Sequence, residues 1–213
     1  MYTGELTDAN ICGIFHNAGD FVRRQLCCGE FTIYAYSIDG LTSGGDISDY
    51  VLKPISRLKA ATMDDLLQKA MDGQIYNVVA VPCEDLNTAA LHLVNGFCVV
   101  LFPGVGAIGY EVKTPDKRGP SAPEVENTVK GAKDAFVETV RSNTSYIRRH
   151  LRAPNLRIFE TQVGRRSLTN VSILWLDGLT DPTLVEKMKE RIGSIDVDGF
   201  LSPSAVEEYI TGS

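Results

Sequence analysis

Apolar and polar positions along the chain predict two segments built on the same plan. Residues 33–42 read IYAYSIDGLT and residues 171–180 read VSILWLDGLT, so each is an apolar run that ends at Asp-Gly and continues into Leu-Thr. Asp-Gly favours a turn, because glycine tolerates a positive φ and aspartate bonds to nearby backbone. A strand-like segment that ends in glycine precedes each run, at 21–29 and at 156–164. A repeated unit of strand, strand, Asp-Gly and helix predicts two related lobes in one chain.

Elsewhere, apolar periodicity predicts strands that alternate with helices. This alternation is typical of an α/β protein, and we expect a mixed sheet in each lobe. In the first lobe the expected strands are 21–28, 31–38, 75–82, 97–102 and 107–112, and the expected helices are 46–57, 62–73 and 84–96. In the second lobe the expected strands are 156–163, 170–177 and 195–201, and the expected helices are 182–192 and 203–210.

The order of these elements divides the chain into four parts. Residues 1–20 carry no regular pattern and are expected to be an irregular lead-in, and residues 21–113 form the first α/β lobe. Residues 114–123 (TPDKRGPSAP) combine prolines, a glycine and charges, which is the composition of a linker. Residues 124–213 begin with a long helical segment, 124–151, in which apolar residues recur three or four apart, and continue into the second lobe.

The composition narrows the class of protein. The chain has 213 residues, of which 44% are hydrophobic and 23% charged, and a net charge of −6, which gives no general attraction to nucleic acid or to anionic membranes. Its five cysteines are odd in number and lack metal-site spacing, which indicates reduced thiols in an intracellular protein. We find no signal peptide and no apolar run near the roughly 20 residues that span a bilayer. We therefore expect a soluble intracellular chain without a nucleic-acid partner.

Residues suited to catalysis are few. The histidines His16, His92 and His150 lie in the lead-in, on an apolar helix and among arginines, and no Ser or Cys stands in a nucleophile-elbow pattern. Residues 104–109 (GVGAIG) match G-x-G-x-x-G, but the strand-like YEVKT follows where a helix N-terminus would have to hold a pyrophosphate. The sequence therefore predicts no enzyme, no cofactor and no metal site.

One stretch departs from the acidic character of the chain. Residues 141–166 hold seven arginines against a single acid, Glu160. Arginine forks bind carboxylates and phosphates with two parallel hydrogen bonds, so the stretch is a candidate surface for an anion or an acidic partner. The alternative is a helix end whose cations are solvated or paired within the chain, since cations there favour the helix dipole. The candidate binding residues are Arg141, Asn143, Arg148, Arg149, Arg152, Arg165 and Arg166.

Three ordered segments of the second half resemble a known family. They are APEVENTVKGAKDAFVETVRSNTSYIRRHL, LRIFETQVGRRSLTNVSILWLDGLTDPTLVEKMKERI and GSIDVDGFLSPSAVEEYI. Their order and spacing resemble the N-terminal soluble domain of the A subunits of GerA-type spore germinant receptors, with a looser match in the first half. Residues 130–136 read KGAKDAF where the family commonly has R-G-P-R-E-G-F, so this chain resembles a divergent member.

The resemblance implies a place and a role for the chain. Family A subunits continue into a membrane-embedded helical region, which implies that this sequence is a fragment of a longer protein. The domain would lie on the cytoplasmic, spore-core side of the spore inner membrane, beside the B and C subunits and other A subunits. It would act in receptor assembly and signal transmission during germination rather than in catalysis.

A second interpretation stays open on the residues themselves. Two lobes joined by a linker and a long helix can move against each other, and such a motion couples binding to a downstream response. A cleft between the repeats would then take a small solute or an anion. This alternative predicts a two-lobed small-molecule-binding module.

Overall fold

The structure, a computed structural model, describes residues 1–72, 79–113, 136, 139–166 and 168–198. It divides the chain into two compact units. The first unit holds Met1–His16 and Asp20–Pro154, and the second holds Asn17–Gly19 and Asn155–Ser213. The chain therefore passes between the units on either side of the short Asn17–Gly19 segment and again after Pro154.

A five-stranded sheet forms the centre of the first unit. Its strands are β1 (Phe21–Cys28), β2 (Phe31–Ile38), β4 (Phe97–Phe102), β5 (Gly106–Glu111) and β3 (Ala80–Cys83), in this spatial order. All four neighbouring pairs run antiparallel. The central strands β4 and β5 are buried over almost their whole length, because helices cover both faces of the sheet.

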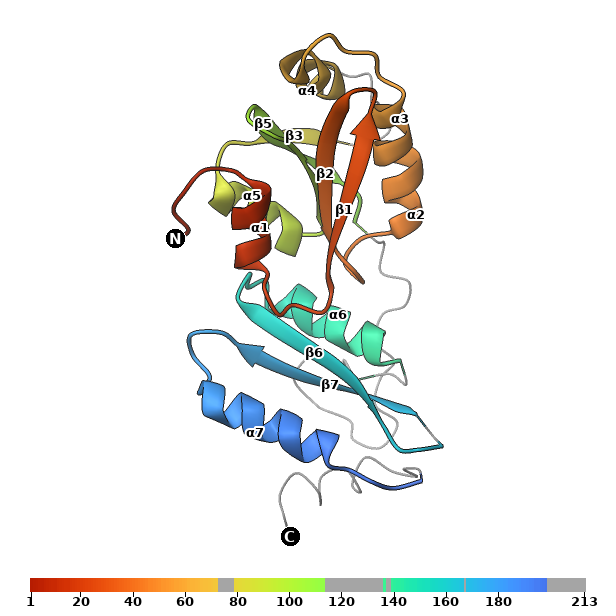
Figure 1. Cartoon of the computed structure of the whole chain (residues 1–213), viewed down its shortest axis with the longest axis vertical. Coiled ribbons are helices and arrows are strands. Elements are labelled where there is room, and N and C mark those ends of the chain that lie inside the picture. Colours follow the sequence, from red (N-terminus) through yellow and green to blue (C-terminus); the bar gives the residue numbers. More distant parts are fainter. Residues whose placement is uncertain (73–78, 114–135, 137–138, 167, 199–213) are drawn as a thin grey trace, which may run out of the picture. The chain divides into compact units, whose positions relative to one another are not determined.

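The two faces are covered by different helices (Figure 1). One face packs against α2 (Gly44–Asp46), the π-helix η1 (Ile47–Leu52), α3 (Lys53–Ser56) and α4 (Met63–Met71). Their core joins Val51, Ile55 and Leu66 to sheet residues such as Val100 and Ile108. The opposite face packs against α5 (Leu86–Val94), where a Cβ added to Gly109 would lie 2.6 Å from His92 Nδ1. The last helix of this unit is α6 (Val140–His150).

Helix α1 (Asp8–Ile14) corrects the expectation of an irregular lead-in over 1–20. Thr7 caps the helix, and Ile11 and Ile14 bury against the rest of the unit. The Asp8 carboxylate accepts hydrogen bonds from Arg23 Nε and Nη2, both at 2.7 Å. These bonds hold the pKa of Asp8 down at about 2. A seven-residue helix is too short to produce a visible period, and its docking depends on contacts that are distant in sequence.

The second unit contains a β-hairpin and a helix. Strands β6 (Leu156–Val163) and β7 (Thr169–Leu176) pair antiparallel, and α7 (Pro182–Gly193) packs on one face through a small core of Val163, Ile192 and Ile195. The Asn17–Gly19 segment adds to the β6 edge, where Gly19 N–H donates to Ile158 O at 2.8 Å. A Cβ at Gly19 would lie 2.8 Å from the same oxygen, so this contact requires glycine.

The α/β class is confirmed, with three differences of detail. Both sheets are antiparallel between their named strands, so the expectation of mixed sheets is wrong. Helix α6 groups with the first unit and not with the hairpin that follows it. The two lobes also differ in content, with five strands against two in the described part, so the internal repeat stays a prediction.

Several expected elements lie wholly or partly outside the described residues. These are the linker 114–123, the helical segment before residue 139, residues 75–78 of the strand 75–82, residues 199–201 of the strand 195–201 and the helix 203–210.

Candidate functional site

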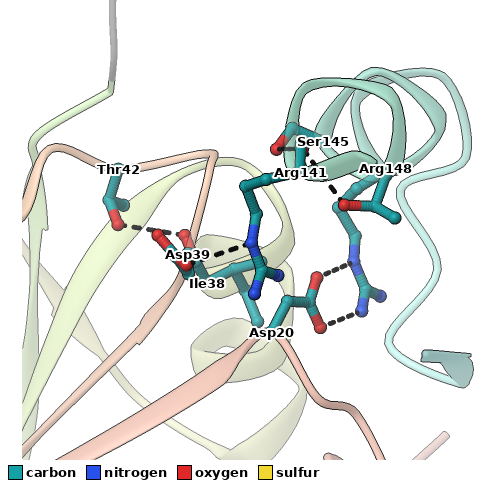
Figure 2. Close-up of polar contacts among 8 residues, drawn as sticks. Asp20, Ile38, Asp39, Thr42, Arg141, Ser145 and Arg148 are labelled. Atoms are coloured by element: carbon teal, nitrogen blue, oxygen red, sulfur yellow. Dashed lines mark hydrogen bonds and ion pairs between the residues drawn. The ribbon is translucent and has the colours of Figure 1, made fainter. Parts of the chain in front are cut away.

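The candidate site is the place where α6 lies on the turn that ends β2 (Figure 2). Strand β2 stops at Ile38, and the chain reverses at Asp39-Gly40, where Gly40 has a φ of +86°. Asp39 N–H donates to Asp20 O at 2.8 Å, and the Thr42 hydroxyl donates to Ile38 O at 3.0 Å. These bonds give the turn a fixed shape against which a helix can pack.

Helix α6 approaches this turn so closely that only glycine fits. A Cβ added at Gly40 would lie 1.8 Å from Ser145 Oγ, well inside van der Waals contact. Two arginines of α6 bind the same turn: Arg141 Nε lies 3.3 Å from Asp39 Oδ2, and Arg149 Nη2 donates to Gly40 O at 3.3 Å. Ser145 therefore lies over Gly40, and the guanidinium groups of Arg141 and Arg149 bind the same turn.

A buried ion pair fastens the same helix more deeply. Arg148 Nε and Nη2 donate to the two Asp20 carboxylate oxygens at 3.0 and 2.7 Å, as Figure 2 shows. The Arg148 side chain is 0% exposed and that of Asp20 is 3% exposed. Two parallel hydrogen bonds between opposite charges form the strongest common type of side-chain pair. Removing one partner from such a pair costs about 3–5 kcal/mol, because the other charge stays buried without compensation.

The Arg148–Asp20 pair lies beside the two points at which the chain leaves the first unit. Asp20 is the first residue of the first unit after the Asn17–Gly19 segment. Arg148 Nη1 also donates to Ala153 O at 3.1 Å, one residue before Pro154, at which the first unit ends. Within the first unit, Arg148 therefore binds both segments that connect to the second unit, one at Asp20 and the other at Ala153.

The second Asp-Gly turn, in the second unit, also contacts an arginine. Arg157 Nη2 lies 2.9 Å from Asp177 Oδ2, and the Arg157 side chain is 4% exposed. Asn155 forms two hydrogen bonds with the backbone of Asp177. Asp177 N–H donates to Asn155 O at 2.9 Å, and Asn155 Nδ2 donates to Asp177 O at 2.7 Å. Each Asp-Gly aspartate thus pairs with an arginine, which fits a structural role for both turns.

The structure separates the predicted arginine set into two groups. In the first unit Arg141, Arg148, Arg149 and Arg152 share helix α6 or its end, and Arg152 Nη1 donates to Asn95 Oδ1 at 2.9 Å. In the second unit Arg165 and Arg166 lie at the end of the hairpin, near Asp196 at 2.6 Å and Asp198 at 3.8 Å. Asn143 is part of α6, where its N–H donates to Thr139 O. Every arginine of the set thus has a partner within the chain, most deeply buried at Arg148, and binding of an anion or partner by this set stays a prediction.

The reasoning from sequence did not find the partners of these arginines. Asp20 lies directly before an expected strand, and Gly40 indicates only a turn. No local sequence pattern predicts this pair, since Arg148 and Asp20 are 128 positions apart and meet only in the folded chain.

One cysteine of the described chain lies beside a histidine. Cys83 Sγ lies 3.3 Å from His92 Nδ1, but burial raises the pKa of the Cys83 thiol to about 12 and lowers the pKa of His92. The thiol is therefore protonated at neutral pH and is a weak nucleophile. In the described ranges, no group of three or more His, Cys, Asp or Glu side chains is placed to hold a metal ion.

A cavity of about 400 Å³ lies in the second unit. Its lining residues include Asn17–Gly19, Phe159, Trp175 and Lys189. The Lys189 ammonium lies 5.3 Å from the centre of the Phe159 ring and 5.1 Å from that of Trp175. The lining also includes Glu160, and Lys189 Nζ donates to Glu186 Oε1 at 2.7 Å, so the surface combines apolar faces with charges of both signs.

No helix in the part of the chain that the structure covers has the length and apolar character to cross a membrane.

Comparisons with known proteins place the chain in a family. The family described as Bacillus/Clostridium GerA spore germination protein matches residues 9–213. Stage V sporulation protein AF of Bacillus subtilis (strain 168) is 31% identical over 189 residues, which are 88% of this chain and 38% of that protein. Spore germination protein B1 of the same organism is 24% identical over 178 residues, 81% of this chain and 36% of that protein. The chain thus spans less than two fifths of the length of these curated relatives.

A solved structure shares the fold. The N-terminal domain of the A subunit of the Bacillus megaterium spore germinant receptor GerK3 matches with a TM-score of 0.68 at 20% identity, covering 94% of this chain and 72% of that one. On the family match over residues 9–213, the chain belongs to the GerA family of spore germination proteins.

Proposed function

We propose that this chain is the N-terminal domain of a germinant receptor A subunit that works in receptor assembly and signal transmission, without catalysis. Membership of the GerA family and the fold shared with the GerK3 domain support the proposal. In this proposal the domain lies on the cytoplasmic side of the spore inner membrane. It joins B and C subunits and further A subunits, and a membrane-embedded region completes the protein.

The observation that carries the proposal is the buried Arg148–Asp20 pair beside the connections between the two units. Packed interiors transmit a displacement because they have little room to absorb it. A doubly hydrogen-bonded pair held by Ala153 O would therefore pass a movement of one connecting segment to the other. This arrangement suits a transmitting domain better than a catalytic one.

The exposed arginines of the second unit are the proposed contact with a partner. Arg165 and Arg166 have side chains that are 68% and 84% exposed, and their pairs with Asp196 and Asp198 are equally open to solvent. Exposed pairs of this kind contribute at most about 1 kcal/mol to stability. Charge reversal here therefore changes the surface without unfolding the domain.

We expect Arg166→Glu in the full-length protein to slow nutrient-triggered germination at least tenfold, because it repels an acidic partner surface. The test uses spores in which the variant gene replaces the natural one, and follows the loss of optical density after nutrients are added. Lys187→Glu is the matched control, since Lys187 is an exposed base of α7 outside the predicted set. Normal germination of spores that lack the gene altogether, on every nutrient tried, would overturn the proposed function.

A second candidate function is the binding of a small solute, and the cavity beside Trp175 favours it. Trp175 is the single tryptophan of the chain and lines this cavity, so its fluorescence reports changes in the surroundings of this side chain. We expect a saturable fluorescence change with one class among amino acids, sugars, nucleosides and inorganic anions. Lys189→Gln should weaken that binding at least tenfold, and Lys187→Gln should leave it unchanged. A flat titration with every class at millimolar concentration would remove this candidate.

A further inference from the structure

The three residues Asn17–Gly19, which we call the strap, are the one part of residues 1–154 that belongs to the second unit. Ala18 forms a parallel bridge with Ile158 of β6 and is 8% exposed, and Gly19 N–H donates to Ile158 O at 2.8 Å. Asn17 has a φ of +57°, a conformation that residues with a Cβ rarely adopt. Segments with few buried apolar contacts open locally at a lower free-energy cost than central strands. The strap, with its three residues, is therefore suited to open and close.

The residue that follows the strap is fixed in the first unit. Asp20 O accepts a hydrogen bond from Asp39 N–H at 2.8 Å, and the Asp20 carboxylate binds Arg148 (Figure 2). Gly19 and Asp20 share a planar peptide group, so a restraint on one residue limits the positions of the other. The two hydrogen bonds from Arg148 depend on distance and angle, so they favour one position of the Asp20 backbone. Docking of the strap and formation of the ion pair therefore stabilise each other, because each orders the chain that the other must hold.

The strap also lines the cavity of the second unit, together with Trp175. When the strap leaves β6, one side of this cavity is lost and water reaches the remaining lining. Trp175 is the single tryptophan of the chain, so quenching of its fluorescence by acrylamide measures this exposure. A solute in the cavity contacts the strap, and its binding then shifts the balance between the closed and the open state.

We propose that the strap opens and closes on β6, and that its closed state is coupled to the Arg148–Asp20 pair. A change at the cavity thereby reaches α6 through Gly19 and Asp20, and reaches Ala153 through the hydrogen bond from Arg148 Nη1. This device rests on the proposed transmitting function for its purpose and supplies its route. It requires no contact beyond the strap itself to connect the cavity with α6.

Gly19→Ala is the variant that opens the strap, because the added Cβ would lie 2.8 Å from Ile158 O, a backbone atom. In the purified 213-residue chain we expect acrylamide to quench Trp175 at least twice as strongly as in the natural chain. Hydrogen exchange of residues 144–150 of α6 should become at least tenfold faster, although these residues belong to the first unit. Gly13→Ala is the matched control and should change neither, because a Cβ there has no described neighbour within 4 Å beyond its own helix, α1.

The coupling also has to act in the reverse direction, since linkage between two equilibria is reciprocal. Arg148→Met should at least double the quenching of Trp175, whereas Arg149→Met, which leaves the Arg148–Asp20 pair in place, should not change it. Circular dichroism checks that each variant is folded. Ala18→Gly removes a buried methyl group without a steric clash, so it takes the place of Gly19→Ala if that variant does not fold.

Two results would overturn the proposal. Stronger quenching with unchanged exchange in α6 would show that the strap opens without any effect on the first unit. Unchanged quenching in the strap variant or in Arg148→Met would show that these contacts do not hold the strap closed. Either result would leave the proposed receptor function in place, because that function is tested by the germination of spores that lack the gene.

Discussion

Replacing Arg148 with methionine is expected to lower the free energy of unfolding by about 3–5 kcal/mol, because it leaves the Asp20 carboxylate buried without its partner. Both groups are almost fully buried and share two hydrogen bonds of 3.0 and 2.7 Å. The loss also frees Ala153 O, which accepts a bond from Arg148 Nη1. Urea denaturation of the 213-residue chain, followed by circular dichroism, measures the effect.

Two further variants make this prediction specific to the pair. The double variant Arg148→Met with Asp20→Leu removes both charges, and a buried pair replaced by apolar residues is often neutral or stabilising. We therefore expect the double variant to recover most of the lost stability. Arg149→Met is the matched control, since its side chain is half-buried and a hydrogen bond such as that to Gly40 O contributes about 1 kcal/mol. Losses in the two single variants that simply add in the double variant would show that the charges do not act together.

Replacing Gly40 with alanine is expected to cost about 2–5 kcal/mol, because two penalties combine. A left-handed backbone costs a residue with a Cβ about 1–2 kcal/mol, and overpacking costs about 1–3 kcal/mol more. Gly40 incurs both penalties, with a φ of +86° and an added Cβ 1.8 Å from Ser145 Oγ. The free energy of unfolding of the variant, measured as above, reports the sum.

Gly178→Ala separates the two penalties of the Gly40 prediction. Gly178 has a nearly identical φ of +81°, but no described atom lies within 4 Å of its added Cβ. It should therefore lose only the backbone part, about 1–2 kcal/mol. Equal losses in the two variants would mean that α6 does not pack against the Asp39-Gly40 turn.

Local patterns predicted much of the fold. Strands β1, β2, β4 and β6 lie at the expected positions, because each is a strand-like segment bounded by glycine, proline or polar residues. Helix α5 begins at its Asp85 cap and ends at Asn95-Gly96, as the capping signals indicate. These features depend on residues that are close in sequence, so one sequence is enough to predict them.

The arrangement of the candidate site could not be predicted in the same way. The arginine-rich stretch is visible as a charge anomaly, but whether its arginines face solvent or pair inside the chain depends on residues far away in sequence. Arg148 pairs with Asp20 and Arg152 with Asn95, across separations of 128 and 57 residues. The glycine at position 40 predicted a turn, and only the folded chain reveals that α6 needs the space above it.

Hydrogen exchange of α6 tests most directly the claim that the Arg148–Asp20 pair fastens this helix to the first unit. In the natural chain, the amides of residues 144–151 should exchange about as slowly as those of β2. In Arg148→Met, a loss of about 3–5 kcal/mol should speed exchange in α6 at least a hundredfold, since each 1.4 kcal/mol is tenfold. Unchanged exchange in α6 of this variant would contradict the account.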